Sequence, residues 1–176
     1  KDIKIKPFAI GGTQNQITDE KTVNDNIGNG GFDIYYGLKS NLTLNLTYNT
    51  DFAQVEADNA QINLTRFNLF YPEKREFFLT RSKLFAFGNS RQTEVFFSRK
   101  IGLNQDVVGG ARMFGQIGKT SVGALNIHTR DDGDLPATHY SAIRLRKDVR
   151  DRTTGGAIIT DVSSKGVRNA VYGIDG

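Results

Sequence analysis

The chain has 176 residues, of which 38% are hydrophobic and 24% are charged, and it contains no cysteine. This length suits one domain, and the lack of cysteine argues against a small secreted module held by disulfides. The longest apolar runs are far shorter than the roughly 18 to 20 residues that a membrane-spanning helix needs. A membrane-spanning β-strand needs only about 9 to 11 residues of alternating character, so periodicity has to decide between a soluble and a membrane-bound sheet.

The first fifty residues predict three strands. Residues 1–7 alternate isoleucine with lysine and begin without a signal-peptide pattern, so we expect a mature segment or a fragment. Residues 31–38 and 42–49 alternate large apolar with polar side chains and are joined by a Lys-Ser-Asn turn, which predicts a hairpin. The polar, Asn- and Gly-rich residues 13–31 show no such pattern, and we expect an exposed loop there.

Alternation returns after residue 105 and predicts further strands, about eight in all. The apolar sides of these strands carry Val107, Ala111, Met113, Ile117, Leu125, Ile127, Ile143 and Leu145. The same sides are padded with glycines at 109, 115, 123 and 155, whereas the polar sides carry Arg112, Arg144 and Arg146. A soluble sandwich needs large side chains to fill the space between its sheets, so a lipid-facing exterior around a wet lumen fits better. We therefore expect an all-β fold, an antiparallel transmembrane β-barrel segment. A soluble β-sandwich with a solvated basic face remains the alternative.

A phenylalanine-rich insert separates the two groups of strands. Within it, residues 58–70 predict a short helix that ends at Tyr71 before Pro72, with Asp58 or Asn59 as N-cap. An aromatic cluster is expected from Phe77, Phe78, Phe85, Phe87, Phe96 and Phe97. An eight-stranded barrel is filled by its own side chains, so either the insert lies outside or the barrel is larger than this chain. We predict one structural domain: first barrel strands in 1–49, a plug-like, inward-folded insert in 50–100 and further strands in 101–176.

Charged residues of the insert and of the lumen side are the candidate site. Ligand binding or clamping of the insert is predicted for Asp51, Glu56, Asp58, Arg66, Glu73, Lys74, Arg75, Glu76, Arg112, Arg144 and Arg146. Asp51, Glu56 and Asp58 are oxygen donors of the kind that Ca²⁺ prefers, but they lack the order of an EF-hand, and pairing with basic residues is favoured. Glu73 and Glu76 could form a glycosidase pair, but adjacent residues of an extended chain point apart, which favours an ion-pair clamp. No catalytic residue and no cofactor is assigned.

Other charged groups exclude some functions. His128 and His139, the only histidines, lack any accompanying catalytic or zinc motif. The acidic loop at 131–134 is expected to be solvated, with a surface cation site as the alternative. The net charge of +4 comes from basic residues spread along different strands rather than clustered with aromatics, so nucleic-acid binding is not expected.

One block of the sequence resembles a known family. The run SNLTLNLTYNTDFAQVEADNAQINLTRFNLFYPEKREFFL, followed by LFAFG and VFFSRKIG, is similar to the signature block of a large Bacteroidetes outer-membrane barrel family of unknown function. The later runs GGARMFGQIG, SVGALNIHT, AIRLRKD and GAIITD are similar to its barrel strands. Departures are Asn49-Thr50-Asp51-Phe52 for the usual Asn-Pro-Asp-Phe, and Glu76-Phe77-Phe78 for the frequent Pro-Phe-Phe.

Members of that family are commonly described as carbohydrate-binding family 9-like domain proteins or membrane-associated hydrolases. The resemblance implies a sugar-binding domain followed by a barrel, of which this chain holds an inner part of the barrel. We expect a non-enzymatic barrel in the outer membrane of a Gram-negative bacterium, serving in passage, binding or anchoring at the cell surface. Its expected partners are outer-membrane lipid, other outer-membrane or periplasmic proteins, and glycan. The alternative is a surface glycan-binding protein or glycan hydrolase, because fold alone does not decide function.

Overall fold

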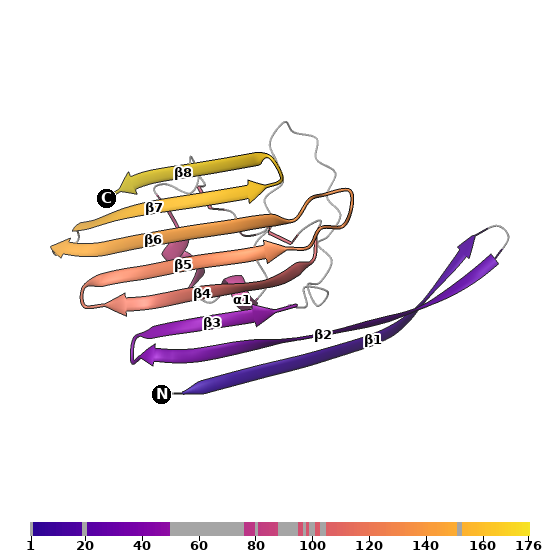
Figure 1. Ribbon diagram of the computed structural model, residues 1–176. Helices are drawn as coiled ribbons and strands as arrows, with labels where there is room; N and C mark the ends of the chain where they lie inside the picture. The colour runs from indigo at the N-terminus through magenta and orange to yellow at the C-terminus, as the bar shows by residue number, and fades with distance from the viewer. Residues whose placement is uncertain are drawn as a thin grey trace, which may run out of the picture.

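The computed structural model describes residues 2–18, 21–49, 76–79, 81–87, 95–96, 98, 101–102, 105–150 and 153–176. These residues form one antiparallel sheet of eight strands with almost no helix (Figure 1). The strands are β1 (Ile3–Thr18), β2 (Lys21–Lys39), β3 (Leu42–Tyr48), β4 (Val107–Ile117), β5 (Thr120–Thr129), β6 (Thr138–Arg150), β7 (Thr153–Ser164) and β8 (Val167–Asp175). The helical turns are α1 (Glu76–Leu79) and the 3-10 helix η1 (Ser82–Phe85). No helix in these ranges is long and apolar enough to cross a membrane.

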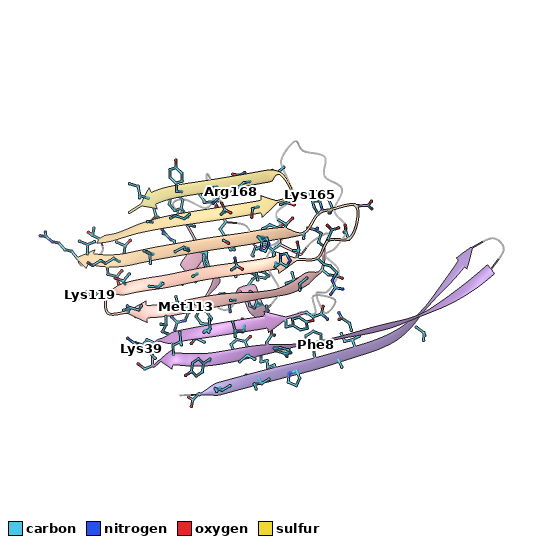
Figure 2. All side chains as sticks on the ribbon, in the orientation of Figure 1. Phe8, Lys39, Met113, Lys119, Lys165 and Arg168 are labelled. Carbon is cyan, nitrogen blue, oxygen red and sulfur yellow. The ribbon has the colours of Figure 1, made fainter. Side chains whose placement is uncertain are left out.

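Each strand pairs with the next one along the chain, so the spatial order is β1 to β8 and β1 and β8 are the two edges. The predicted all-β class and the strand number are confirmed. Two-residue connections follow β2, β4 and β6 at one end of the sheet, which Lys39 and Lys119 mark in Figure 2. The opposite end, marked by Lys165 and Arg168, carries the connection at 130–137, the two-residue connection after β7 and the long segment between β3 and β4.

The predicted loop at 13–31 is wrong. β1 and β2 remain paired as far as Thr18 and Lys21, and their ribbon projects beyond the other strands (Figure 1). β3 pairs only with the part of β2 from Phe32 to Lys39, so among the strands that the structure describes none lies beside the outer part of the ribbon. The backbone ladder satisfies the hydrogen-bonding groups of such a ribbon without a packed face. No apolar alternation is therefore needed in its sequence, and none was there to detect.

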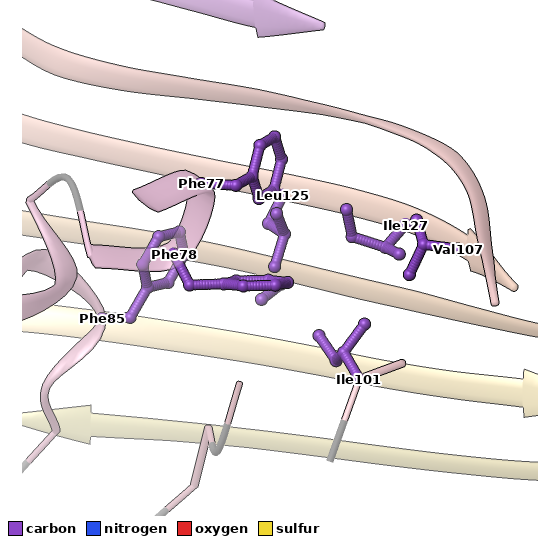
Figure 3. Packing of buried hydrophobic residues seen from close by; sticks show 8 residues of the cluster. Phe77, Phe78, Phe85, Ile101, Val107, Leu125 and Ile127 are labelled. Carbon is purple, nitrogen blue, oxygen red and sulfur yellow. The ribbon is translucent and has the colours of Figure 1, made fainter. Parts of the chain in front are cut away.

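We call the side of the sheet that contacts α1 and η1 the inner face, and the opposite side the outer face. On the inner face Phe77, Phe78 and Phe85 pack against Leu125 and other buried residues of β5 and β6 (Figure 3). The remaining members of this cluster are Ile101, Val107, Ile127 and Ala142. Burying a side chain of this size contributes about 1.5 to 3 kcal/mol, so the cluster is what fixes α1 and η1 on the sheet.

The outer face carries a row of register partners that crosses all eight strands. Its members are Ile3, Tyr36, Leu44, Met113, Ala124, Ile143, Ile159 and Tyr172. Ile143 and Ile159 are 49% and 53% exposed, although neither lies on an edge strand of the sheet. Large apolar side chains therefore stay uncovered on this face.

Three residues lie on the face opposite to the one that alternation predicts. Leu125 and Ile127 face inward with Arg144, while the polar partners Asn126 and His128 face outward. Val107 also faces inward, because a β-bulge between Val107 and Gly109 shifts the alternation by one residue. The apolar side of β5 packs against the phenylalanines of α1 and η1, which we call the aromatic lobe. β5 therefore turns its apolar side inward, whereas β3 and β6 turn theirs outward.

The insert agrees with the prediction in part. The predicted helix at 58–70 lies outside the described residues, as does Phe97. Phe77, Phe78 and Phe85 are buried together, and Phe96 packs at the margin of the cluster, 5.1 Å from Phe85 between ring centroids. These rings pack on the sheet as well as on one another, whereas α1 and η1 themselves were not predicted.

Candidate functional site

The structure places only part of the predicted site. Asp51, Glu56, Asp58, Arg66, Glu73, Lys74 and Arg75 lie outside the described residues, and Glu76 is the first residue of α1. Arg112, Arg144 and Arg146 all lie on the inner face. The first two are buried there, whereas Arg146 is exposed.

Arg112 of β4 is held between two aromatic rings. Its guanidinium lies 4.7 Å from the ring centroid of Phe77 in α1 and 4.7 Å from that of Phe114 two residues along β4. The side chain is only 2% exposed, and its register partner on β3 is the fully buried Asn45. A planar guanidinium stacks on aromatic faces in a way that an ammonium does not. Arg112 therefore ties the insert to β4.

Arg144 of β6 forms a two-point ion pair with Asp175 of β8. Its Nη1 and Nη2 donate to Oδ1 and Oδ2 of Asp175, both at 2.7 Å. Arg144 is 2% exposed and Asp175 is 19% exposed. The guanidinium also lies 5.5 Å from the ring centroid of Phe87, the second residue after η1. One buried cation thus joins two strands that are not neighbours and contacts the insert as well.

Glycines on the inner face make these contacts geometrically feasible. A Cβ at Gly156 would lie 2.6 Å from Nη1 of Arg144 and 2.6 Å from Oδ1 of Asp175, because the ion pair passes over this residue of β7. A Cβ at Gly173 would lie 2.5 Å from Cζ of Phe87. Gly123, read from the sequence as padding of the lipid-facing side, instead faces the insert: a Cβ there would lie 2.7 Å from Leu84 of η1.

A cavity of about 570 Å³ opens beside η1, near the end of the sheet that carries the connections after β4 and β6. Its lining includes three cations, Arg81, Lys83 and Arg146, together with Asp148. The apolar part of the lining is formed by Leu79 and Leu84. Nη2 of Arg146 donates a long hydrogen bond, 3.4 Å, to Oγ1 of Thr154. Of these residues the sequence singled out only Arg146; the short basic run Arg81-Ser82-Lys83 beside the aromatic cluster was a signal that went unused.

The outer face becomes polar toward the end that carries residues 130–137. The rings of His128 and His139 stack across β5 and β6 with centroids 4.1 Å apart. Arg168 Nε donates to Asp161 Oδ2 at 2.6 Å, which joins β8 to β7. Neither histidine meets a third metal-ligating side chain within the part of the chain that the structure describes. This patch therefore bounds the apolar row rather than forming a metal centre.

The acidic loop at 131–134 uses its carboxylates on its own backbone. Oδ1 of Asp131 accepts from the N–H of Gly133 at 2.9 Å, and Oδ1 of Asp132 accepts from that of Leu135 at 2.7 Å. Gln105 closes the loop by donating to the carbonyls of Leu135 and Pro136. These bonds are typical of turn formation.

Among curated proteins and among solved structures, none matches this chain. One family model, described as a domain of unknown function (DUF5916), matches residues 3–112, more than half of the chain. The matched residues include β1 to β3, α1, η1 and the first half of β4 as far as Arg112, and they end before Arg144. The chain therefore belongs to the family named Domain of unknown function, DUF5916.

Proposed function

We propose that this chain forms part of the wall of an outer-membrane β-barrel of a Gram-negative bacterium, with α1 and η1 on the lumen side as part of a plug. In this proposal the barrel serves in passage, binding or anchoring at the cell surface, alone or with other outer-membrane or periplasmic proteins. The resemblance to the Bacteroidetes barrel family supports the same conclusion. No cofactor is required.

The contrast between the two faces of the sheet carries the proposal. The inner face holds buried arginines and packs against the aromatic lobe, whereas the outer face leaves Ile143, Ile159 and their neighbours about half exposed. In water such a continuous apolar surface is unfavourable and marks an interaction site. Hydrocarbon would cover it, and a barrel strand requires apolar side chains outward and polar ones inward.

The shape of the apolar region supports strands that are tilted to a membrane. One register row of the outer face holds aromatic side chains on β2 and β3, where Phe32 stacks on Tyr48 with centroids 5.6 Å apart. On β5 to β8 the same row holds His128, His139 and polar partners. The apolar band therefore crosses the strands obliquely, as it does where strands tilt by roughly 35 to 45° in a bilayer.

The ends of the sheet suggest an orientation. Outer-membrane barrels have short periplasmic turns and longer extracellular loops. The two-residue connections after β2, β4 and β6 would then face the periplasm, and the projecting β1–β2 ribbon and residues 130–137 would face outward. Because α1 and η1 cover the inner face, an eight-stranded barrel would have no room for them, and we infer further strands beyond β1 and β8. The proposal keeps one structural domain, with first barrel strands in 1–49, a plug-like insert in 50–100 and further strands in 101–176.

The alternative, a surface glycan-binding protein or glycan hydrolase, has no specific observation in its favour. Its candidate carboxylates, Asp51, Glu56, Asp58 and Glu73, lie outside the described residues. Of the described carboxylates on the inner face, Asp175 is engaged by Arg144. A barrel wall that carries a plug is therefore the better-supported proposal.

Lipid contact can be measured directly because the chain has no cysteine of its own. Ile143→Cys and Ile159→Cys place a fluorophore on the outer face of the full-length chain, and Lys165→Cys places one in the exposed turn after β7 as a control. In vesicles of lipids brominated on their tails we expect quenching at 143 and 159 but not at 165. Equal, weak quenching at all three positions in a correctly folded protein would refute the barrel wall.

A further inference from the structure

The cavity beside η1 is built by the docking of η1 on β5. Leu84 and Phe85 occupy the space above Gly123, which fixes the height of η1 over the sheet. Arg81, just before η1, has a left-handed backbone with φ 55° and ψ 35°, a conformation that non-glycine residues seldom adopt. The cavity is lined by Arg81 and η1 on one side and by residues of β4, β5 and β6 on the other.

The charges around the cavity are not balanced. Arg81 and Lys83 approach from the insert and Arg146 from β6, while Asp148 is the single carboxylate in the lining. Within the described residues no carboxylate forms an ion pair with any of these three cations. Arg144, two residues before Arg146 on the same face, does have its own partner in Asp175. Cations gathered without partners repel one another, and an anion placed among them removes that cost.

The structure assigns to this cavity the binding of an oxyanion: a phosphate, sulfate or carboxylate group of a solute. Guanidinium groups match such anions with two parallel hydrogen bonds, and Lys83 adds a third donor. The volume of about 570 Å³ exceeds that of a bare ion and falls within the range of small-molecule pockets. Leu79, 46% exposed at the rim, and Leu84 offer an apolar wall for the carbon framework that carries the anion.

This inference deepens the proposed function, since it names the class of solute that the barrel would bind or pass. The inference depends on the proposed function in one respect only, that the cavity opens into the lumen of a barrel. Lys147 provides a matched control, because it follows Arg146 on β6 and therefore points to the outer face. Removing its charge changes the net charge equally without touching the cavity.

Calorimetric titration of the full-length chain with inorganic pyrophosphate, at constant ionic strength in a non-ionic detergent, tests the assignment. We expect saturable binding that Arg146→Gln and Lys83→Gln each weaken about tenfold, since a hydrogen bond to a charged group accounts for about one such factor. Lys147→Gln should change the affinity less than twofold.

Asp148→Asn tests whether weaker binding by the other variants comes from misfolding. It removes the one negative charge in the lining and should tighten binding several-fold, which a misfolded protein cannot do. No saturable binding by the unaltered chain, or equal effects of Arg146→Gln and Lys147→Gln, would overturn the assignment. Lipid quenching at Ile143 and Ile159 is independent of pyrophosphate binding, so failure of the cavity and failure of the barrel wall can be told apart.

Discussion

Two adjacent glycines of β7 offer a test of how the inner face is held together. The Arg144–Asp175 ion pair passes over Gly156, and a Cβ there would come within 2.6 Å of an atom of each partner. Gly155 faces the other way, and a Cβ there would meet nothing within 4 Å. Gly156→Ala and Gly155→Ala are therefore the same chemical change with opposite surroundings.

The cost of Gly156→Ala follows from the pair that it disrupts. The guanidinium of Arg144 lies at the end of a flexible side chain, so it can move, but it is 2% exposed and would lose both 2.7 Å hydrogen bonds. Leaving a buried charge without its partner costs about 3 to 5 kcal/mol. Asp175 is 19% exposed, so water recovers part of this, and we expect the low end of the range. Alanine in a strand regains about 0.5 to 1 kcal/mol over glycine, which leaves a net loss of about 2 to 3 kcal/mol.

The measurement is the free energy of unfolding of the full-length chain in guanidinium, in the same detergent or vesicle for every variant. Gly155→Ala should be neutral or slightly stabilising. Asp175→Asn, combined with Gly156→Ala, should add no more than about 1 kcal/mol to the single change, because the two act on one interaction. If Gly156→Ala unfolds like Gly155→Ala, the ion pair contributes little and this account of the inner face is wrong.

Three further predictions concern the other contacts of the sheet. Arg112→Lys keeps the charge but loses the stacking between Phe77 and Phe114, and should lower the free energy of unfolding by about 1 to 2 kcal/mol. If the variant is as stable as the parent, the stacking on these rings does not stabilise the fold. Gly123→Val should displace Leu84 and Phe85 from β5, and trypsin should then cut after Arg81 and Lys83 at least several times faster, whereas an unchanged rate would mean that η1 does not depend on this contact. Ile159→Lys should lower the free energy of unfolding in a bilayer by about 2 to 4 kcal/mol, whereas Thr153→Lys, at the exposed start of β7, should leave it almost unchanged. Equal stabilities of the two variants in vesicles would place Ile159 outside the hydrocarbon.

Much of the sheet could be predicted from period-two alternation alone. β3 alternates strictly from Leu42 to Tyr48 and was predicted at 42–49, whereas of β2 only the part at 31–38 was predicted. The outer part of the ribbon of β1 and β2 was missed because its paired backbone forms without apolar alternation in its sequence. The bulge after Val107 was missed for a related reason: a single extra residue reverses the faces without changing the composition.

The candidate site was recognised by its arginines but not by their partners. Arg112 and Arg144 stood out because charged side chains recur on the polar sides of strands that otherwise look greasy. Asp175 is thirty-one residues away from Arg144 and becomes its partner only through the register of β6, β7 and β8. Phe87 and Gly173 likewise meet only when the insert has docked. Local patterns carry no information about such contacts.

The reversal on β5 shows what alternation leaves undetermined. Periodicity identifies the two sides of a strand, but it names the core side only when a single side is apolar. Here Ile143 on β6 is apolar toward the outer face, and Leu125 on β5 is apolar toward the aromatic lobe, so both faces of one sheet require apolar residues. The inner-face glycines mark where side chains pack closely on the sheet: Gly123, Gly156 and Gly173 each lie where a Cβ would collide with a side chain, whereas Gly155 on the outer face has open space. Gly109 and Gly115 also lie on the outer face, so the presence of a glycine does not by itself identify the side on which the insert docks.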